Sequence, residues 1–237
     1  MRFKKCKKKR FGRFNKWVKN KIRVVYNGVD STKLIPQKEI RHAVREKLGI
    51  DNQVLIGIIG NIIPIKGQDF FLKGIAKAKE YKPNLYVKIL IIGRSIDHLY
   101  KQKIRQLVKD LDLIDDVIFM NYTEKIDEIF SALDIFVLSS KREGFSRSLL
   151  EAMSFGLPIL ATKIDEIEEA VISGKNAILM NFGDVENLAS GIIKLYENKK
   201  LREKMGIKNC KRLSEKFNLQ LHSEAVTNIY HELLHFQ

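Results

Sequence analysis

The chain has 237 residues, of which 45% are hydrophobic and 30% are charged, so it can bury a full core. Its two cysteines, Cys6 and Cys210, exclude a disulfide framework and indicate a reducing cytoplasm. No stretch approaches the roughly 20 apolar residues of a membrane-spanning helix, and the N-terminus lacks the apolar core of a signal peptide. We therefore expect a cytoplasmic protein, bound at most peripherally to the inner face of the cell membrane.

The formal net charge of +15 is concentrated at the N-terminus. Residues 1–23 contain twelve lysines and arginines and no acidic residue, and subtracting these twelve from +15 leaves +3 for the remainder. Apolar side chains recur between these cations at helical spacing: Phe11, Phe14, Trp17 and Val18. Residues 1–21 are therefore predicted to be an amphipathic helix on an anionic membrane surface or a solvated basic tail. Nonspecific contact with phosphate backbones is a third alternative, and no specific nucleic-acid binding is expected.

From residue 22 onward, short apolar and β-branched runs alternate with helical patterns. The runs predict strands at 22–26, 54–60, 87–93, 117–120, 135–138, 159–161 and 177–180. Helices are predicted at 37–48, 68–81, 96–111, 125–132, 146–155, 166–172 and 185–196, followed by closing helices at 200–217 and 218–235. This alternation is typical of an α/β fold, a doubly wound, Rossmann-like parallel sheet of about six strands with helices on both faces.

The same pattern predicts the division of the chain. A tail at 1–21 precedes one domain at 22–217, and an amphipathic helix at 218–237 follows it. The apolar stripe of that last helix needs a surface to pack on. In a doubly wound sheet, ligands bind at the carboxyl ends of the strands.

A glycine-containing loop follows the predicted strand at 54–60. It begins at Gly60 and Asn61, and Lys66 and Gly67 open the next helix. The spacing matches neither the dinucleotide fingerprint nor the P-loop. A lysine beside exposed amides at the positive end of a helix is well placed to hold a phosphate, but a solvated lysine near a turn fits the spacing equally well.

Two carboxylates eight positions apart, Glu143 and Glu151, flank the start of the helix predicted at 146–155. If both face the strand ends, they suit the hydroxyls of a sugar, because charged acceptors make the stronger hydrogen bonds. The favourable interaction of acidic residues with a helix start explains the same spacing without a ligand.

A formal H-E-x-x-H zinc pattern occurs in the last helix, at residues 231–235. No third ligand follows it in this sequence, and its two leucines belong to the apolar stripe of the helix. No metal site is therefore predicted.

Several of these segments, taken in order, resemble one protein family. They are Asn27-Gly28-Val29-Asp30, Gly60 to Gly67, Ile91-Ile92-Gly93, Ser139 to Phe145 with Leu150 to Pro158, and Gly174-Lys175-Asn176 with Gly183-Asp184. The set runs from about residue 22 to residue 217. It resembles the C-terminal, nucleotide-sugar-binding half of a family 4 glycosyltransferase of GT-B fold.

The resemblance implies a retaining, metal-independent glycosyltransferase of the hexosyltransferase type, acting in polysaccharide biosynthesis without a cofactor. It would move a sugar from a nucleoside diphosphate sugar to a glycan or lipid-linked acceptor. The resemblance implies catalytic roles for Glu143, at the donor sugar hydroxyls, and for Lys66, at the diphosphate, whose growing charge a fixed cation stabilises. Glu151 would bind the ribose. The other residues implied to bind the nucleotide sugar are Gly60, Asn61, Gly144, Phe145, Ser146, Arg147 and Ser148.

This sequence departs from the family pattern in three ways. Asn61 stands where many relatives carry an arginine, which removes one phosphate-binding charge, and residues 163–166 replace the usual small residues of their loop. Because only residues 1–21 precede the matching region, we expect the N-terminal acceptor domain of the family to be missing from this chain. We therefore expect a donor-binding domain that works with a separate acceptor-domain subunit or within a longer parent protein. The alternative is a non-catalytic remnant or binding module that needs a partner subunit.

Overall fold

The computed structural model describes residues 22–32, 34 and 36–234, so the predictions for residues 1–21 lie outside it. Within this part, one parallel sheet has the strand order β3-β2-β1-β4-β5-β6. Its strands are β1 (Val54–Ile59), β2 (Val87–Ile92), β3 (Val117–Met120), β4 (Ile135–Leu138), β5 (Ile159–Thr162) and β6 (Ala177–Met180). The predicted doubly wound sheet of about six strands is confirmed.

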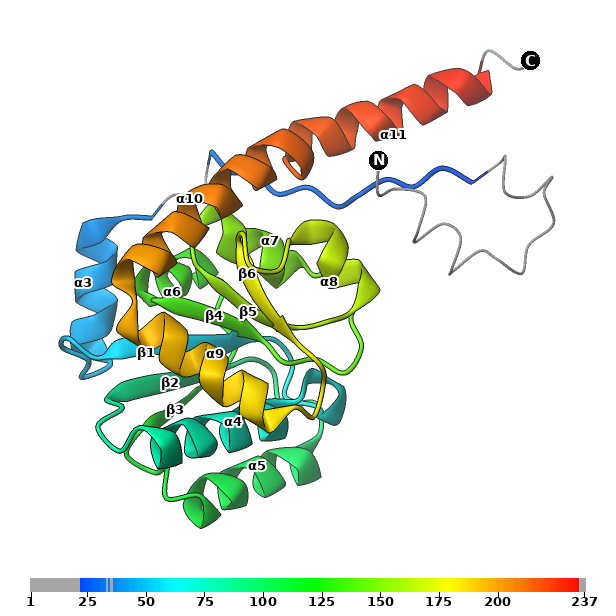
Figure 1. Cartoon of the computed structure of the whole chain (residues 1–237). Helices are drawn as coiled ribbons and strands as arrows, with labels where there is room; N and C mark the ends of the chain where they lie inside the picture. The colour runs from blue at the N-terminus through cyan, green and yellow to red at the C-terminus, as the bar shows by residue number, and fades with distance from the viewer. Residues whose placement is uncertain (1–21, 33, 35, 235–237) are drawn as a thin grey trace.

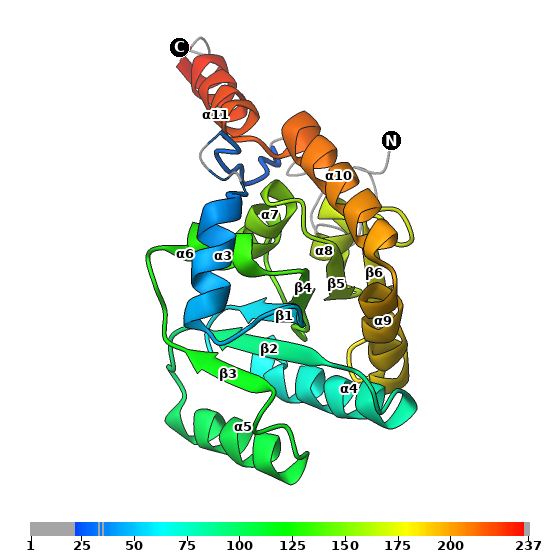
Figure 2. The ribbon, with the colours of Figure 1, turned by 90° about the vertical axis from the view of Figure 1, so that its left-hand side faces the viewer.

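Helices cover both faces of this sheet (Figures 1 and 2). They are α3 (Lys38–Lys47), α4 (Gln68–Tyr81), α5 (His98–Asp110), α6 (Ile126–Ala132), α7 (Arg147–Ser154), α8 (Asp165–Ala170), α9 (Val185–Glu197), α10 (Lys199–Lys216) and α11 (Leu219–Leu234), with a short 3-10 turn η1 (Pro64–Lys66). The predicted helices agree to within two residues at each end. The differences have local causes: the helix predicted from residue 96 starts at His98, because the Asp97 side chain caps it by accepting from the Tyr100 amide at 2.9 Å.

The central strands are continuous apolar runs because both of their faces are buried. Side chains alternate along each strand, so Leu55 belongs to one core and Ile56 to the other, and both are fully buried. The core of Leu55 includes side chains of α6, α7 and α8, whereas that of Ile56 includes side chains of α4, α5 and α9. The sheet therefore separates two apolar cores.

The predicted strand at 22–26 is wrong, since these residues pair with no strand of the sheet. They run beside α11, where Nδ1 of His222 lies 2.7 Å from the Tyr26 carbonyl oxygen and Arg23 lies 3.7 Å from Glu232. Further along, Val29 forms an isolated bridge with Asn218. An apolar run can be extended without joining a sheet when its backbone groups find other partners.

Helix α11 extends away from the sheet (Figure 1) and buries none of its described side chains. Tyr230 is 64% exposed and Leu234 is 67% exposed, whereas Val226 and Ile229 are partly buried, so the stripe predicted to need a packing surface is only partly covered here. The domain boundaries at 21/22 and 217/218 stay predictions. None of the described helices is both long enough and apolar enough to cross a membrane.

The strand order reverses between β1 and β4, and we call the region beyond the carboxyl ends of these two strands the crevice. These two strands are neighbours, but the chain leaves β1 for α4 on one face and leaves β4 for α7 on the other. The carboxyl ends of such divergent neighbours form the position where doubly wound sheets bind ligands.

Candidate functional site

Lys66 and Glu143 meet at this crevice although they lie 77 positions apart in the sequence. Nζ of Lys66 lies 2.8 Å from both carboxylate oxygens of Glu143. The two side chains are 23% and 9% exposed, so water screens this ion pair only in part. Removing either partner would leave a largely buried charge without its counterion.

The turn that carries Lys66 is fastened to the end of β4. Oγ of Ser139 lies 3.0 Å and 2.9 Å from the carbonyl oxygens of Lys66 and Gly67, and the Lys141 amide donates to the Ile65 carbonyl at 2.8 Å. Gly67 has a φ of 65°, and a Cβ there would lie 2.3 Å from the Ser139 carbonyl oxygen. Only glycine fits this close approach, which sets the position of the neighbouring Lys66.

The N-terminus of α7 lies directly after the Glu143 loop. Ser146 caps this helix, with its Oγ accepting from the Leu149 amide at 3.4 Å and lying 3.1 Å from Oγ of Ser148. The amides of Arg147 and Ser148 belong to the first turn, so they have no carbonyl partner within the helix. Such amides bind anions, aided by the helix dipole.

Glu151 lies one turn further along α7 and has a different partner from Glu143. One of its carboxylate oxygens lies 2.9 Å from Nε of Arg147. The Glu151 side chain is 10% exposed and that of Arg147 is 81% exposed. Burial raises the pKa of Glu151 above its ordinary value, and the Arg147 guanidinium opposes that rise only in part.

This raised pKa predicts a pH-dependent effect of Glu151→Gln. The native state holds the Glu151 proton more tightly than the unfolded chain does, so the wild type loses stability as the pH rises through the raised native pKa. The glutamine variant has no such loss, so we expect it to be the more stable protein at neutral pH. Urea unfolding from about pH 4 to about pH 7 measures the difference. A difference between the two proteins that does not grow with pH would contradict the prediction.

The remaining predicted site residues contribute mainly backbone groups to the structure around the site. Gly60 donates its amide to the Ile92 carbonyl at 3.0 Å, and the Asn61 carbonyl accepts from the Gln68 side chain at 2.9 Å. A Cβ at Gly144 would contact nothing within 4 Å, so the loop is open there. The ring of Phe145 is partly buried and packs against the apolar core, while its backbone forms part of the loop.

Sequence reasoning missed a set of polar groups at the same edge of the sheet. Among the described residues, three buried side-chain oxygens have no hydrogen-bond partner: Gln68 Oε1, Ser95 Oγ and Ser140 Oγ. These residues follow β1, β2 and β4, so all three lie beyond the carboxyl ends of strands. Buried polar groups normally have partners, so three such oxygens beyond the same edge of the sheet indicate a place for a polar ligand or water. Ser139, Ser140 and Thr162, at the ends of apolar strands, were the signal for this polar edge.

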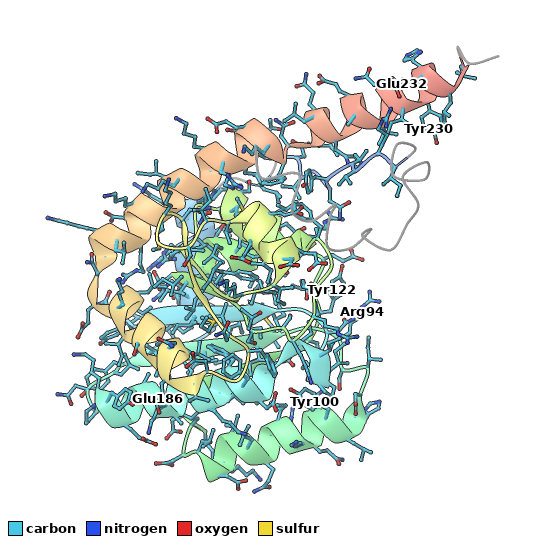
Figure 3. All side chains as sticks on the ribbon, turned by 45° about the vertical axis from the view of Figure 1, so that its right-hand side comes forward. Arg94, Tyr100, Tyr122, Glu186, Tyr230 and Glu232 are labelled. Carbon is cyan, nitrogen blue, oxygen red and sulfur yellow. The ribbon has the colours of Figure 1, made fainter. Side chains whose placement is uncertain are left out.

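Arg94 and Tyr122 form a second surface at this edge, beyond β2 and β3 (Figure 3). The guanidinium carbon of Arg94 lies 4.5 Å from the centroid of the Tyr122 ring, within the range of a cation–π interaction. Tyr122 is 51% exposed, so its ring is accessible beside the crevice.

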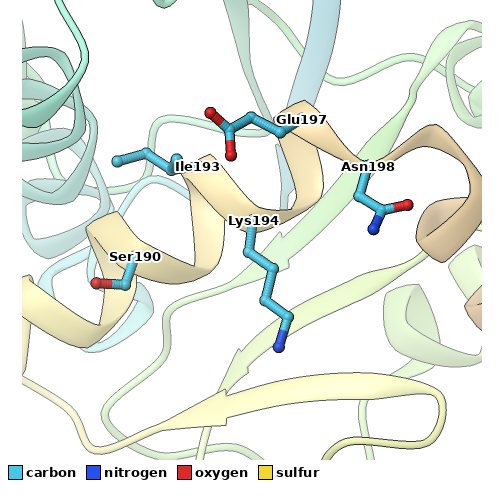
Figure 4. Close-up of a pocket in the computed structure, with 5 residues that line it drawn as sticks. All are labelled: Ser190, Ile193, Lys194, Glu197 and Asn198. Atoms are coloured by element: carbon cyan, nitrogen blue, oxygen red, sulfur yellow. The ribbon is translucent and has the colours of Figure 1, made fainter.

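One depression on the molecule lies elsewhere. It has a volume of about 410 Å³ and is lined by Ser190, Ile193, Lys194, Glu197 and Asn198 (Figure 4). A helix that follows a parallel strand runs back along the sheet, so this C-terminal part of α9 lies at the amino edge, opposite the crevice. In the described part of the chain, no three His, Cys, Asp or Glu side chains gather as metal ligands, and position 235 of the zinc-like pattern lies outside that part.

The chain is similar to known proteins over most of its length. The sequence model of the family described as glycosyl transferases group 1 matches residues 40–212. The mannosylfructose-phosphate synthase of Agrobacterium fabrum is 28% identical over 186 residues, which cover 76% of this chain and 41% of that protein. The N-acetyl-alpha-D-glucosaminyl L-malate synthase of Bacillus anthracis is 27% identical over 214 residues, which cover 90% of this chain and 54% of that protein. The chain thus spans about half the length of these curated relatives.

Solved structures share the fold. HepE of Anabaena in complex with UDP-glucose superposes with a TM-score of 0.82 at 23% identity, covering 88% of this chain and 57% of that one. The C-terminal domain of LpcC, a group 1 glycosyl transferase of Francisella tularensis, superposes with a TM-score of 0.72 at 26% identity. That match covers 81% of this chain and 100% of the LpcC domain.

Proposed function

This chain belongs to the glycosyl transferases group 1 family, and we propose that it binds the nucleoside diphosphate sugar of a retaining, metal-independent glycosyl transfer. The observation that carries this proposal is the contact between Lys66 and Glu143, at 2.8 Å, beside the N-terminus of α7. A cation, helix-terminal amides and two carboxylates are then available at one edge of the sheet. These groups suit the diphosphate, the sugar and the ribose of such a donor.

Each part of the donor has a partner of suitable chemistry. In the proposal, Lys66 and the amides at the start of α7 hold the diphosphate, and they stabilise the charge that it gains as the glycosidic bond breaks. Glu143 accepts from hydroxyls of the donor sugar, and Glu151 accepts from hydroxyls of the ribose. The unpartnered oxygens of Gln68, Ser95 and Ser140 support a polar occupant at this edge.

The binding of the donor changes the partner of Lys66. In the structure, its ammonium group is already neutralised by Glu143. A diphosphate competes for the same ammonium, so the loss of the carboxylate contact offsets part of the attraction between the diphosphate and Lys66. We propose that the displaced Glu143 then takes up the sugar hydroxyls, which would make the binding of diphosphate and sugar interdependent.

We further propose that the chain corresponds to a C-terminal, donor-binding half of a family 4 enzyme. The full coverage of the LpcC C-terminal domain supports this assignment. Matches to complete relatives cover 41% and 54% of their lengths, so we propose that a further unit binds the acceptor, within a longer protein or as a separate subunit. Names of relatives such as the lipopolysaccharide core biosynthesis mannosyltransferase LpsB of Rhizobium meliloti support a glycan or lipid-linked acceptor.

Thermal unfolding in the presence of UDP, GDP and ADP, each with and without an attached sugar, tests donor binding. We expect one nucleotide to stabilise the wild type, by about 2.7 kcal/mol at a concentration 100 times its Kd. Glu151→Ala should lose this stabilisation, whereas Glu203→Ala, at an exposed glutamate of α10, should retain it. If no nucleotide stabilises the wild type, the proposed donor site is wrong.

A second candidate function is a binding module without transferase activity of its own. The coverage of about half of each relative favours it, because transfer also needs an acceptor site. The two candidates differ in one assay, the transfer of a radiolabelled sugar from its nucleotide to membrane extracts. Transfer by this chain alone would exclude the binding module, whereas nucleotide binding without transfer, both alone and with an added acceptor unit, would support it.

A further inference from the structure

Three aromatic rings from distant parts of the sequence meet behind the Glu143 loop. The ring of Tyr26 lies 5.0 Å from that of Phe145 and 5.6 Å from that of Phe217, measured between centroids. The rings of Phe145 and Phe217 are 5.2 Å apart. All three distances fall in the range of favourable aromatic contacts, so the cluster joins the segment before α3, the site loop and the end of α10.

The Tyr26 segment is itself held in place by the junction of α10 and α11. The Val29 amide donates to the Phe217 carbonyl at 3.1 Å, and the Leu219 amide donates to the Val29 carbonyl at 3.0 Å. A Cβ at Gly28 would lie 2.4 Å from the Asn218 carbonyl oxygen, so the two backbones approach as closely as glycine permits. The segment therefore offers Phe145 a fixed surface.

The loop that carries Glu143 is attached to the rest of the protein both before and after that residue. At its start, the Lys141 amide bonds to the turn that carries Lys66. At its end, the Phe145 ring enters the aromatic cluster and the Phe145 carbonyl accepts from the Asn27 side chain at 3.4 Å. Gly144, between Glu143 and Phe145, has open space around it, so it adds no packing of its own. Together with the ion pair to Lys66, the second attachment therefore constrains where the carboxylate of Glu143 can lie.

We propose that Tyr26 is a positioning residue for the donor site, acting through Phe145 on Glu143 and on the first amides of α7. Tyr26 lies outside the region 40–212 that matches the family. Part of the frame of the site is thus supplied by the segment that also contacts α11, through the Tyr26 carbonyl and His222. The ligand-binding part of this inference rests on the proposed function.

Tyr26→Leu tests the role of the ring, and Tyr26→Phe keeps that ring as the matched control. Because Tyr26→Leu loses its aromatic contacts, we expect it to bind the nucleoside diphosphate sugar about 5- to 10-fold more weakly than the wild type. Tyr26→Phe keeps the ring, so its affinity should be close to that of the wild type. Tyr86→Leu makes the same change at a tyrosine that is 68% exposed just before β2, and it should bind normally. Titration calorimetry at one salt concentration measures all four proteins.

Hydrogen exchange gives a readout that does not depend on a ligand. We expect the amides of residues 143–149 to exchange at least several-fold faster in Tyr26→Leu, while amides of β1 and β2 keep their wild-type protection, because the loop loses its second attachment. Normal exchange in that loop would overturn the inference, even if no nucleotide binds. If exchange increases equally throughout the protein, Tyr26 is only structural and the inference is also overturned. Failure of the wild type to bind any nucleotide, with faster loop exchange in the variant, would overturn the proposed function alone.

Discussion

Replacing Lys66 with alanine is expected to weaken the binding of a nucleoside diphosphate by about 10- to 100-fold. Hydrogen bonds to charged groups contribute about 1.5–3 kcal/mol, and the diphosphate would lose the cation carried by the turn after β1. The variant should also be less stable without ligand, because the carboxylate of Glu143, with its side chain 9% exposed, loses the ammonium that neutralises it. Titration calorimetry and urea unfolding measure the two effects.

Two controls separate charge from folding. Lys73→Ala removes an exposed lysine of α4 and should leave both affinity and stability near the wild type. The double variant Lys66→Ala, Glu143→Gln removes the unpaired carboxylate and should recover stability while its nucleotide affinity stays low. Wild-type affinity in Lys66→Ala would show that the lysine only neutralises Glu143.

Replacing Glu143 with glutamine is expected to have opposite effects on two ligands. The free ammonium of Lys66 no longer has to leave a carboxylate, so binding of the nucleoside diphosphate alone should be at least as tight as in the wild type. The additional affinity for the attached sugar should be lost, because the amide is a weaker acceptor for its hydroxyls. In the assembled enzyme we expect transfer to fall by about 100-fold, the effect typical of one polar group aimed at the reacting centre.

Calorimetry with the nucleotide and with its sugar conjugate gives the affinity ratio on which this prediction depends. Glu203→Gln makes the same change at an exposed position of α10 and should keep the wild-type ratio. An equal loss of affinity for both ligands would mean that Glu143 only holds Lys66 in place. Unchanged affinities for both ligands would place the sugar elsewhere.

The sheet could be predicted because its signal is local. The run 54–60 is apolar at every position and the run 87–93 at every position but Lys88, which in a chain of alternating helices indicates central parallel strands. That Lys66 and Glu143 lie at the same edge could be predicted for the same reason, since parallel strands end at one edge of a sheet. The run at 22–26 is also largely apolar apart from Arg23, and its tertiary partners, on α11, separate it from a strand.

The rest of the site could not be predicted because it depends on long-range contacts without periodicity. Ser139 binds two carbonyls of a turn more than 70 positions earlier, and Tyr26 meets Phe217 across most of the chain. Neither contact leaves a repeating pattern in the sequence. The pairing of Glu151 with Arg147 is different, because their spacing of four residues on a helix is a recognisable signal.

The strand order has a consequence for synthesis of the chain. β1 lies between β2 and β4, and its register with β4 pairs Ile56 with Ile135. The ribosome therefore synthesises almost 80 further residues after β1 before its second neighbouring strand exists. Contacts between residues so distant in sequence form late and slowly, because a long loop must close first. A growing polypeptide that has reached only α6 would carry the lysine of the crevice without its carboxylate. Nucleotide capture by nascent chains of increasing length should therefore begin only after β4 and α7 have left the ribosome.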